Sequence, residues 1–162
     1  MVYKIRDLFQ AETVALIELV NGNEKFKIPE FQRPYSWRNN EEILRFLEDV
    51  LDSKISTDDP NTPIDTYFIG PMITYREDKK AENLVIDGQQ RFTTIILIIT
   101  ALRDLLKAVE NDDWRDYNEY LNYKDKSLAG QNRYESRLTL SNRDAVKYFE
   151  DLMSIDEVDD PY

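Results

Sequence analysis

Apolar residues recur with a helical period from Phe92 to Val109, the longest regular pattern in the chain. The residues on one face of this helix are Ile95, Ile98, Leu102, Leu105 and Val109, and those on the opposite side are Arg103, Lys107 and Glu110. The β-branched residues from Thr93 to Thr100 favour a strand by local propensity. The sustained spacing outweighs that propensity and predicts a largely buried helix.

A short apolar run, Leu84-Val85-Ile86, precedes this helix and stops at Asp87-Gly88. Such a run followed by a glycine turn is typical of a buried strand that leads into a helix N-terminus. The first backbone N–H groups of a helix have no partner within it, and the helix dipole is positive at that end. The pattern therefore predicts an anion-binding position between Asp87 and Thr94.

Shorter patterns predict the remaining elements. Before the long helix we expect one or two helices within Val2 to Val20 and a strand at Phe26 to Ile28. We also expect a helix from about Asn40 to Ser53, which begins with a capping box of Asn39 and Glu42. The apolar face of this helix is formed by Ile43, Leu44, Leu47, Val50 and Leu51. A loop from Lys54 to Asp65 and a strand from Thr66 to Tyr75, bent at Gly70-Pro71, follow. After the long helix we expect a helix through Trp114, Tyr117, Tyr120 and Leu121, a strand at Leu138 to Leu140, and a helix through Leu152 capped by Ser141 or Asn142. Together these elements make an α+β fold.

Composition narrows the chemistry. The 162 residues suffice for one domain with its own core. The formal net charge of −11 argues against a general grip on nucleic acid or on anionic membranes, because both require clustered Lys and Arg. Cysteine and histidine are absent, which excludes thiol nucleophiles, His-metal clusters and imidazole bases.

Neither a membrane span nor a signal segment is visible. The longest apolar run is Ile95 to Ile99, far below the roughly 20 residues that span a bilayer. Met1 to Leu8 is charged and lacks the apolar region of a signal segment. We therefore expect a soluble cytoplasmic protein with no membrane partner.

The polar residues at the start of the long helix could bind phosphate and metal. Gly88 permits positive φ and close approach of a ligand, Gln89 and Gln90 offer amide donors, and Arg91 can hydrogen-bond two phosphate oxygens. Asp87 could hold Mg²⁺ directly or through water. The alternative is that Asp87-Gly88 is only a turn and Arg91 a surface charge, and residue chemistry alone leaves both open.

A second Gln-Arg pair, Gln32-Arg33, also stands before a predicted helix and would supply further anion-directed donors. Tyr35 and Trp37 offer flat faces for a base or an arginine, although packing is the favoured role of Trp37. Other candidates are weaker. Thr93 and Thr94 could ligate phosphate or metal or bond the helix backbone, Glu30 could assist Asp87 or be a surface carboxylate, and Gly70 could line the site or mark a bulge.

Three stretches resemble the signatures of the DUF262 family: Ile28 to Trp37, Tyr67 to Gly70, and Ile86 to Thr94. Arg137-Leu138-Thr139-Leu140 resembles the family's downstream region less specifically. DUF262 is the N-terminal domain of GmrSD-type (type IV) restriction systems and related phage-defence proteins, with a fold similar to ParB and sulfiredoxin. The resemblance implies a small mixed sheet packed with helices, with a ParB-like core over residues 1–110 and a helical extension of the same domain over residues 111–162.

The resemblance also implies a domain that binds a nucleoside triphosphate and hydrolyses it with Mg²⁺ or Mn²⁺. Carried over, the catalytic residues are Asp87, Gln90 and Arg91, the metal ligand is Asp87, and the nucleotide-binding residues are Gln32, Arg33, Gly88, Gln89, Thr93 and Thr94. Pro71 departs from the family pattern, in which a small polar residue is usual, and this could alter a donor next to Gly70.

The implied partners are the nucleotide and a C-terminal nuclease domain or partner subunit, with weak or no direct DNA binding and a homodimer as a further option. An HNH nuclease, which family members often append, needs histidines that this chain lacks. The acidic stretch from Ile155 to Tyr162 stops without a closing element, and this abrupt end suggests an excised N-terminal domain or a shortened member. Two alternatives stay open: a non-hydrolysing sensor that reorders the loop from Lys54 to Asp65 or a dimer surface, and a ParB-like nuclease, which the acidic charge disfavours.

Overall fold

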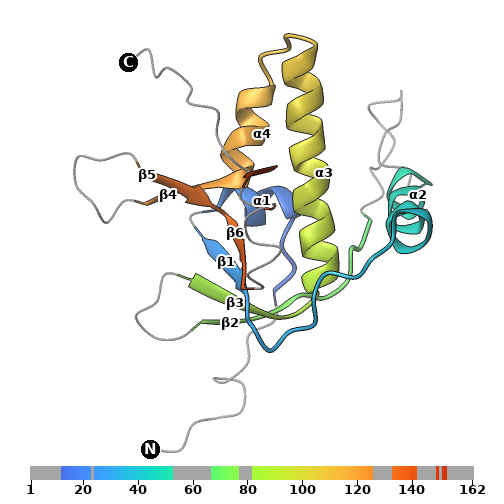
Figure 1. Cartoon of the computed structure of the whole chain (residues 1–162), viewed down its shortest axis with the longest axis vertical. Coiled ribbons are helices and arrows are strands. Elements are labelled where there is room, and N and C mark those ends of the chain that lie inside the picture. Colours follow the sequence, from blue (N-terminus) through green and yellow to red (C-terminus); the bar gives the residue numbers. More distant parts are fainter. Residues whose placement is uncertain are drawn as a thin grey trace, which may run out of the picture.

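The computed structural model describes residues 12–22, 24–52, 67–76, 82–125, 133–141, 149 and 151–152. The elements in chain order are α1 (Leu16–Asn21), β1 (Lys25–Ile28), the π-helical turn η2 (Asn39–Ile43), α2 (Leu44–Asp52), β2 (Ile73–Arg76), β3 (Glu82–Asp87), α3 (Gln89–Ala108), α4 (Trp114–Leu121), β4 (Asn122–Asp125), β5 (Arg133–Ser136) and β6 (Leu138–Leu140) (Figure 1). This arrangement confirms the predicted α+β class.

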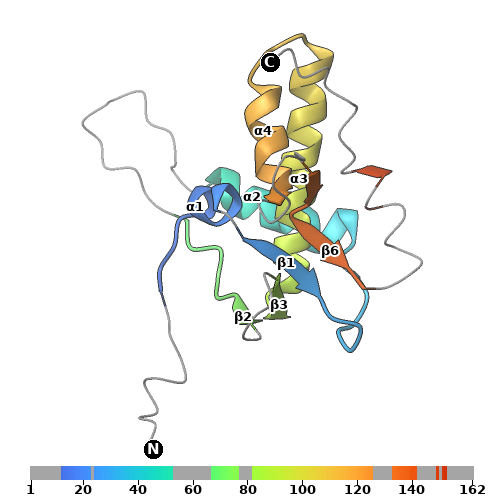
Figure 2. The ribbon, with the colours of Figure 1, turned by 90° about the vertical axis from the view of Figure 1, so that its left-hand side faces the viewer.

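The main sheet has the strand order β2-β3-β1-β6. Strand β1 runs parallel to both β3 and β6, whereas β2 is antiparallel to β3. Helix α3 follows β3 directly and packs on one face of this sheet, with α4 beside it (Figures 1 and 2). The edge of the Phe26 ring meets Phe92 at the helix–sheet contact, with the ring centroids 5.0 Å apart. The first turn of the long helix is therefore packed against the sheet through Phe92.

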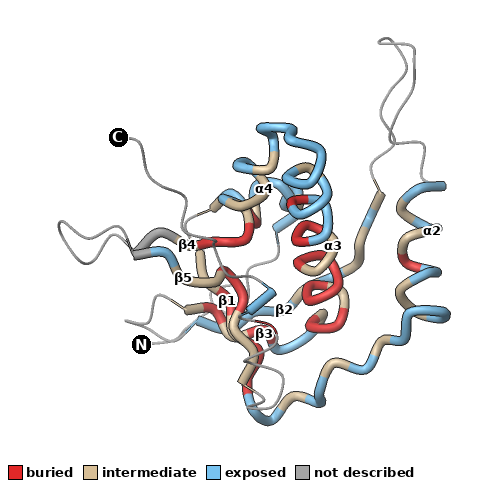
Figure 3. The backbone as a smooth tube through the Cα atoms, turned by 45° about the horizontal axis from the view of Figure 1, so that its top comes forward, coloured by how far each residue is buried: buried red, intermediate tan, exposed pale blue. Residues whose placement is uncertain are grey.

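Helix α3 confirms the predicted helix but not its predicted buried face. The buried stripe runs through Phe92, Ile96, Ile99 and Arg103. By contrast, Leu105 is 62% exposed and Val109 67% exposed, so the predicted face is wrong in the second half of the helix (Figure 3). The buried side of the second half of the helix is that of Ile99 and Arg103, where Arg103 contacts the later segment at Leu152.

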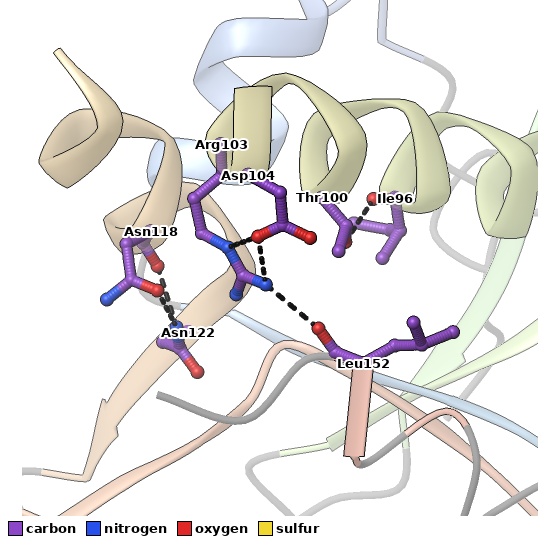
Figure 4. A network of polar contacts seen from close by, with 7 residues as sticks. All are labelled: Ile96, Thr100, Arg103, Asp104, Asn118, Asn122 and Leu152. Carbon is purple, nitrogen blue, oxygen red and sulfur yellow. Dashed lines mark hydrogen bonds and ion pairs between the residues drawn. The ribbon is translucent and has the colours of Figure 1, made fainter. Parts of the chain in front are cut away.

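Arg103 was predicted on the solvated side and is instead buried. Its Nε donates to Asp104 at 2.8 Å, and its Nη2 donates to the carbonyl of Leu152 at 2.9 Å (Figure 4). A polar side chain on the packed face of α3 thus fixes a later part of the chain to this helix. Most of the predicted helix through Leu152 lies outside the described residues. Its described residues Phe149, Asp151 and Leu152 are helical.

Three further predictions differ from the structure in part. The strand expected from Thr66 to Tyr75 is confined to β2, because Gly70 adopts a φ of 104° and Pro71 cannot donate to a strand ladder. Of the predicted apolar face, Leu44 and Leu51 are exposed, whereas Ile43, Leu47 and Val50 are partly buried. Phe46, which was not predicted on that face, is the buried residue of α2, and its ring centroid lies 5.8 Å from that of Trp37. The predicted capping box is shifted, since Glu42 accepts a hydrogen bond from the N–H of Arg38.

Strands β4 and β5 were not predicted, and they pair antiparallel to each other. The link from β5 to β6 is Arg137, a buried guanidinium without a carboxylate partner among the described residues. It donates instead to the backbone carbonyls of Gly22, Glu24, Glu119, Tyr120 and Asn122 at 2.6–3.3 Å. Burial lowers the pKa of the Arg137 guanidinium, but an arginine in a protein stays charged. One side chain thereby joins the entry to β1, the end of α4 and the start of β4.

We predict that Arg137→Lys lowers the free energy of unfolding by about 3 kcal/mol or more, because one ammonium cannot replace a planar fork that reaches several carbonyls. Urea denaturation of the variant measures this loss. The control is Arg115→Ala, which removes an exposed arginine paired with Asp112 and should change stability by about 0.5 kcal/mol or less. Equal stability of the two variants would contradict the role given to Arg137.

Candidate functional site

The start of α3, from Asp87 to Arg91, is here called the α3 mouth. Gly88 precedes the helix with a φ of 85°, and an added Cβ would lie 3.2 Å from the carbonyl oxygen of Pro71. The carboxylate of Asp87 is exposed and accepts the N–H of Gly88 at 2.8 Å. The first helical hydrogen bond runs from Phe92 to Gly88. The N–H groups of the three residues between, Gln89, Gln90 and Arg91, have no acceptor in the described part of the chain.

Two buried glutamines of the α3 mouth hold the segment 29–38, which links β1 to η2. Gln89 donates to the carbonyl of Arg33 at 3.2 Å. Gln90 donates to the carbonyl of Pro34 at 3.2 Å and accepts the N–H of Ser36 at 2.9 Å. The amide of Gln90 therefore pairs with this segment as a neighbouring strand would, by offering one donor and one acceptor to its backbone.

Two more contacts complete this attachment. Gln32 donates to the carbonyl of Ile86, at the end of β3, at 2.6 Å. The hydroxyls of Tyr35 and Thr94 are 2.9 Å apart, and Thr94 in turn donates to the carbonyl of Gln90. Thr93 is buried beside it in the same turn. The bond of Thr94 to the helix backbone matches the structural alternative expected for this residue.

Arg91 holds a second segment, residues 67–72, on the other side of the mouth. Its Nη1 donates to the carbonyl of Ile69 and its Nη2 to that of Pro71, both at 2.9 Å. Gly70 lies between these two acceptors, and a Cβ added to it would come within 1.6 Å of Nη1. The close approach therefore requires glycine at this position, apart from its positive φ.

The structure brings most of the predicted site residues together, since Gln32, Gln89, Gln90, Arg91 and Thr94 meet around one helical turn. Their observed contacts are with backbone, apart from that between the hydroxyls of Thr94 and Tyr35. Two predicted groups are free for a ligand. Arg33 is exposed and its guanidinium has no partner among the described residues, and one oxygen of Asp87 is likewise free there.

Other predicted candidates lie apart from these contacts or serve packing. Glu30 is exposed, with no described contact to Asp87. Trp37 packs on Phe46, as the packing interpretation expected. Within the described ranges, no three acidic side chains gather into a metal-binding cluster. The backbone carbonyls that accept hydrogen bonds from the α3 mouth were not predicted, because a main-chain acceptor is present in every residue and gives no signal in the sequence. The recurrence of the Gln-Arg pair was the available hint.

Free N–H groups at the N-terminus of a helix can bind an anion. The family model described as "GmrSD restriction endonuclease, N-terminal domain" matches residues 16–160. The chain belongs to this family, which confirms the resemblance found in its sequence. Membership of the family indicates a role in a restriction system.

One similarity extends outside that family. The RNA polymerase sigma factor SigA of Mycoplasma genitalium is 23% identical to the chain over 161 residues, which is 88% of this chain and 32% of the sigma factor. The chain thus spans about a third of that protein's length. Among the helices that the structure describes, none is both long and apolar enough to cross a membrane.

We predict that Gln90→Leu, which keeps the bulk of the side chain, loosens the segment 29–38. The amide of Ser36 should exchange with solvent about tenfold faster, because it loses its acceptor. Residue-resolved hydrogen exchange measures the change. In the control variant Leu105→Ala, an exposed residue of the same helix is altered and Ser36 should be unaffected. Unchanged exchange of Ser36 in Gln90→Leu would show that the glutamine does not hold the segment.

We also predict that Gly70→Ala destabilises the protein by about 1–3 kcal/mol through backbone strain and a clash with Arg91. In an Arg91→Ala background the clash is gone, so the same substitution should cost measurably less. Urea denaturation of the wild type, both single variants and the double variant gives this coupling. Additive costs would argue against the contact between Gly70 and Arg91.

Proposed function

We propose that the chain binds a nucleoside triphosphate at the α3 mouth and hydrolyses it with a divalent cation, as the regulatory domain of a restriction system that defends against phage. The observation that carries this proposal is the row of N–H groups at Gln89, Gln90 and Arg91 that have no acceptor in the described part of the chain. Arg33, whose carbonyl accepts from Gln89, adds an exposed guanidinium that has no partner there either. Free N–H groups, a positive helix end and an arginine together favour a polyphosphate.

The residues divide into two roles in this proposal. Arg33 and the N–H groups of the mouth contact the phosphates, with Gly88 allowing close approach. Gln32, Gln89, Gln90 and Thr94 hold the segment 29–38 so that Arg33 stands at the mouth. Arg91, whose two terminal nitrogens already donate to carbonyls, acts mainly by fixing residues 67–72, and Thr93 supports the same turn.

Asp87 suits the cation that hydrolysis would need. Mg²⁺ is commonly bound by one or two carboxylates completed by phosphate oxygens and water, and Asp87 is an exposed carboxylate with one oxygen free in the described structure. Mn²⁺ takes similar ligands. Such an ion neutralises charge on the transferring phosphate. The other oxygen of Asp87 stays on the N–H of Gly88 and fixes the carboxylate in place.

A non-hydrolysing sensor is the second candidate function. The α3 mouth grips the backbone of the segment that leads to η2 and α2, and α2 stands to one side of α3 (Figures 1 and 3). A nucleotide that competes for these glutamines would shift α2 without turnover. A C-terminal nuclease domain, a partner subunit or a second copy would receive this signal. Direct DNA binding is not proposed, because the net charge is −11.

We predict that Arg33→Gln weakens nucleotide binding about tenfold or more, since it removes a charged hydrogen-bond donor. Asp87→Asn should keep binding but lose Mg²⁺-dependent phosphate release. Calorimetry and a phosphate-release assay with ATP, GTP, CTP and UTP measure both effects, and Arg45→Gln, an exposed arginine of α2, is the control. Binding without release by the wild type would select the sensor. Unaltered binding in Arg33→Gln would reject the proposed phosphate site.

A further inference from the structure

Phe31 is a large apolar side chain at the tip of a turn. The N–H of Gln32 donates to the carbonyl of Pro29 at 3.1 Å, so Glu30 and Phe31 occupy the two central positions of a β-turn. Pro29 is buried, whereas Phe31 is 73% exposed. Such positions usually hold Gly, Asn, Asp or Ser, and folding gains little from a ring left in water. The ring is therefore available to something outside the fold.

This turn is fixed to the α3 mouth at two places. Gln32, the residue after Phe31, donates to the carbonyl of Ile86 at 2.6 Å, and Ile86 lies two residues before Gly88. The carbonyl of Arg33 accepts from Gln89 in the first turn of α3. The backbone that carries the ring is thus held beside the free N–H groups of the mouth.

The order of groups along this short stretch matches the parts of a nucleotide. An exposed aromatic ring at Phe31 is followed two residues later by Arg33, whose guanidinium has no partner among the described residues and whose carbonyl is bound to the first turn of α3. We infer that Phe31 stacks on the base of the nucleoside triphosphate while Arg33 and the α3 mouth hold its phosphates. This inference rests on the proposed function. Stacking contacts the face of a base and not its hydrogen-bonding edge, so the contribution is available to all four bases.

A second exposed ring, Phe68, lacks this arrangement. It is 75% exposed on the segment 67–72, but the cation beside that segment, Arg91, has both terminal nitrogens engaged by Ile69 and Pro71. No unpaired cation of the described residues accompanies it along its segment. Phe68 therefore provides a matched control, because its removal takes away an equally exposed ring near the same helix.

The test compares dissociation constants of the wild type, Phe31→Ala, Phe31→Trp and Phe68→Ala for each of the four nucleoside triphosphates and for inorganic triphosphate, all with Mg²⁺. For every nucleotide that the wild type binds, Phe31→Ala should weaken binding about 5- to 150-fold, the usual range for one stacked base. Phe31→Trp should retain it, and Phe68→Ala should match the wild type. Inorganic triphosphate, which has no base, should bind all four proteins equally.

The possible failures are distinguishable. Nucleotide binding by Phe31→Ala that equals the wild type would overturn the stacking role and leave the phosphate site standing. An equal loss for nucleotides and inorganic triphosphate would also overturn it, since the ring would then act on the phosphate site. If the wild type binds neither ligand, the proposed function fails and the inference with it. Because Phe31 is exposed, its variants should unfold at the wild-type temperature, which checks that the fold is intact.

Discussion

The buried guanidinium of Arg137 holds together the parts of this fold that have no regular pairing of their own. Its five carbonyl acceptors come from the entry to β1, the last turn of α4 and the start of β4. Its own backbone completes the junction, because its N–H donates to Leu121 and its carbonyl accepts from Phe26. The carbonyls at the end of α4 carry the negative end of the helix dipole, so they compensate the charge without a carboxylate.

The α3 mouth solves the same physical problem at the opposite end of the sheet. The segments 29–38 and 67–72 have irregular backbones that lie against the protein, and such backbones need hydrogen-bond partners. Gln89, Gln90 and Arg91 supply them with side chains instead of strand neighbours. These side chains are engaged within the domain, whereas the N–H groups of the α3 mouth and the guanidinium of Arg33 have no partner among the described residues. The proposed nucleotide site rests on this difference between the side chains that hold the two segments and the groups that have no described partner.

Sequence patterns predicted the elements that depend on local spacing. The strand before Asp87, the helix that follows and the strand at Leu138 to Leu140 are all present. The patterns failed where a neighbour decides burial. In the second half of α3 the buried side is that of Ile99 and Arg103, which contacts the later segment at Leu152, and this distant neighbour cannot be read from local spacing. Strands β4 and β5 are polar and lack alternation, so they gave no strand signal.

The candidate site divides in the same way. Residue types placed Gln32, Gln89, Gln90 and Arg91 in one functional group, and the structure brings them to one helical turn. Residue types did not indicate that these side chains grip main-chain atoms, because every residue has a carbonyl and an amide. Phe31 escaped notice for a related reason. Its exposure follows from a β-turn that the sequence Pro-Glu-Phe-Gln does not predict.

Hydrogen bonds to main-chain atoms have a consequence for how the sequences of related proteins can diverge. Any residue at positions 33, 34 or 69 offers the same carbonyl to Gln89, Gln90 or Arg91, so side chains there can be exchanged one at a time while the frame stays closed. Gly70 is the exception, because Arg91 fills the space of its missing Cβ. The domain can therefore acquire new ligand preferences by changing residues of the gripped segments, without repacking the helix that grips them.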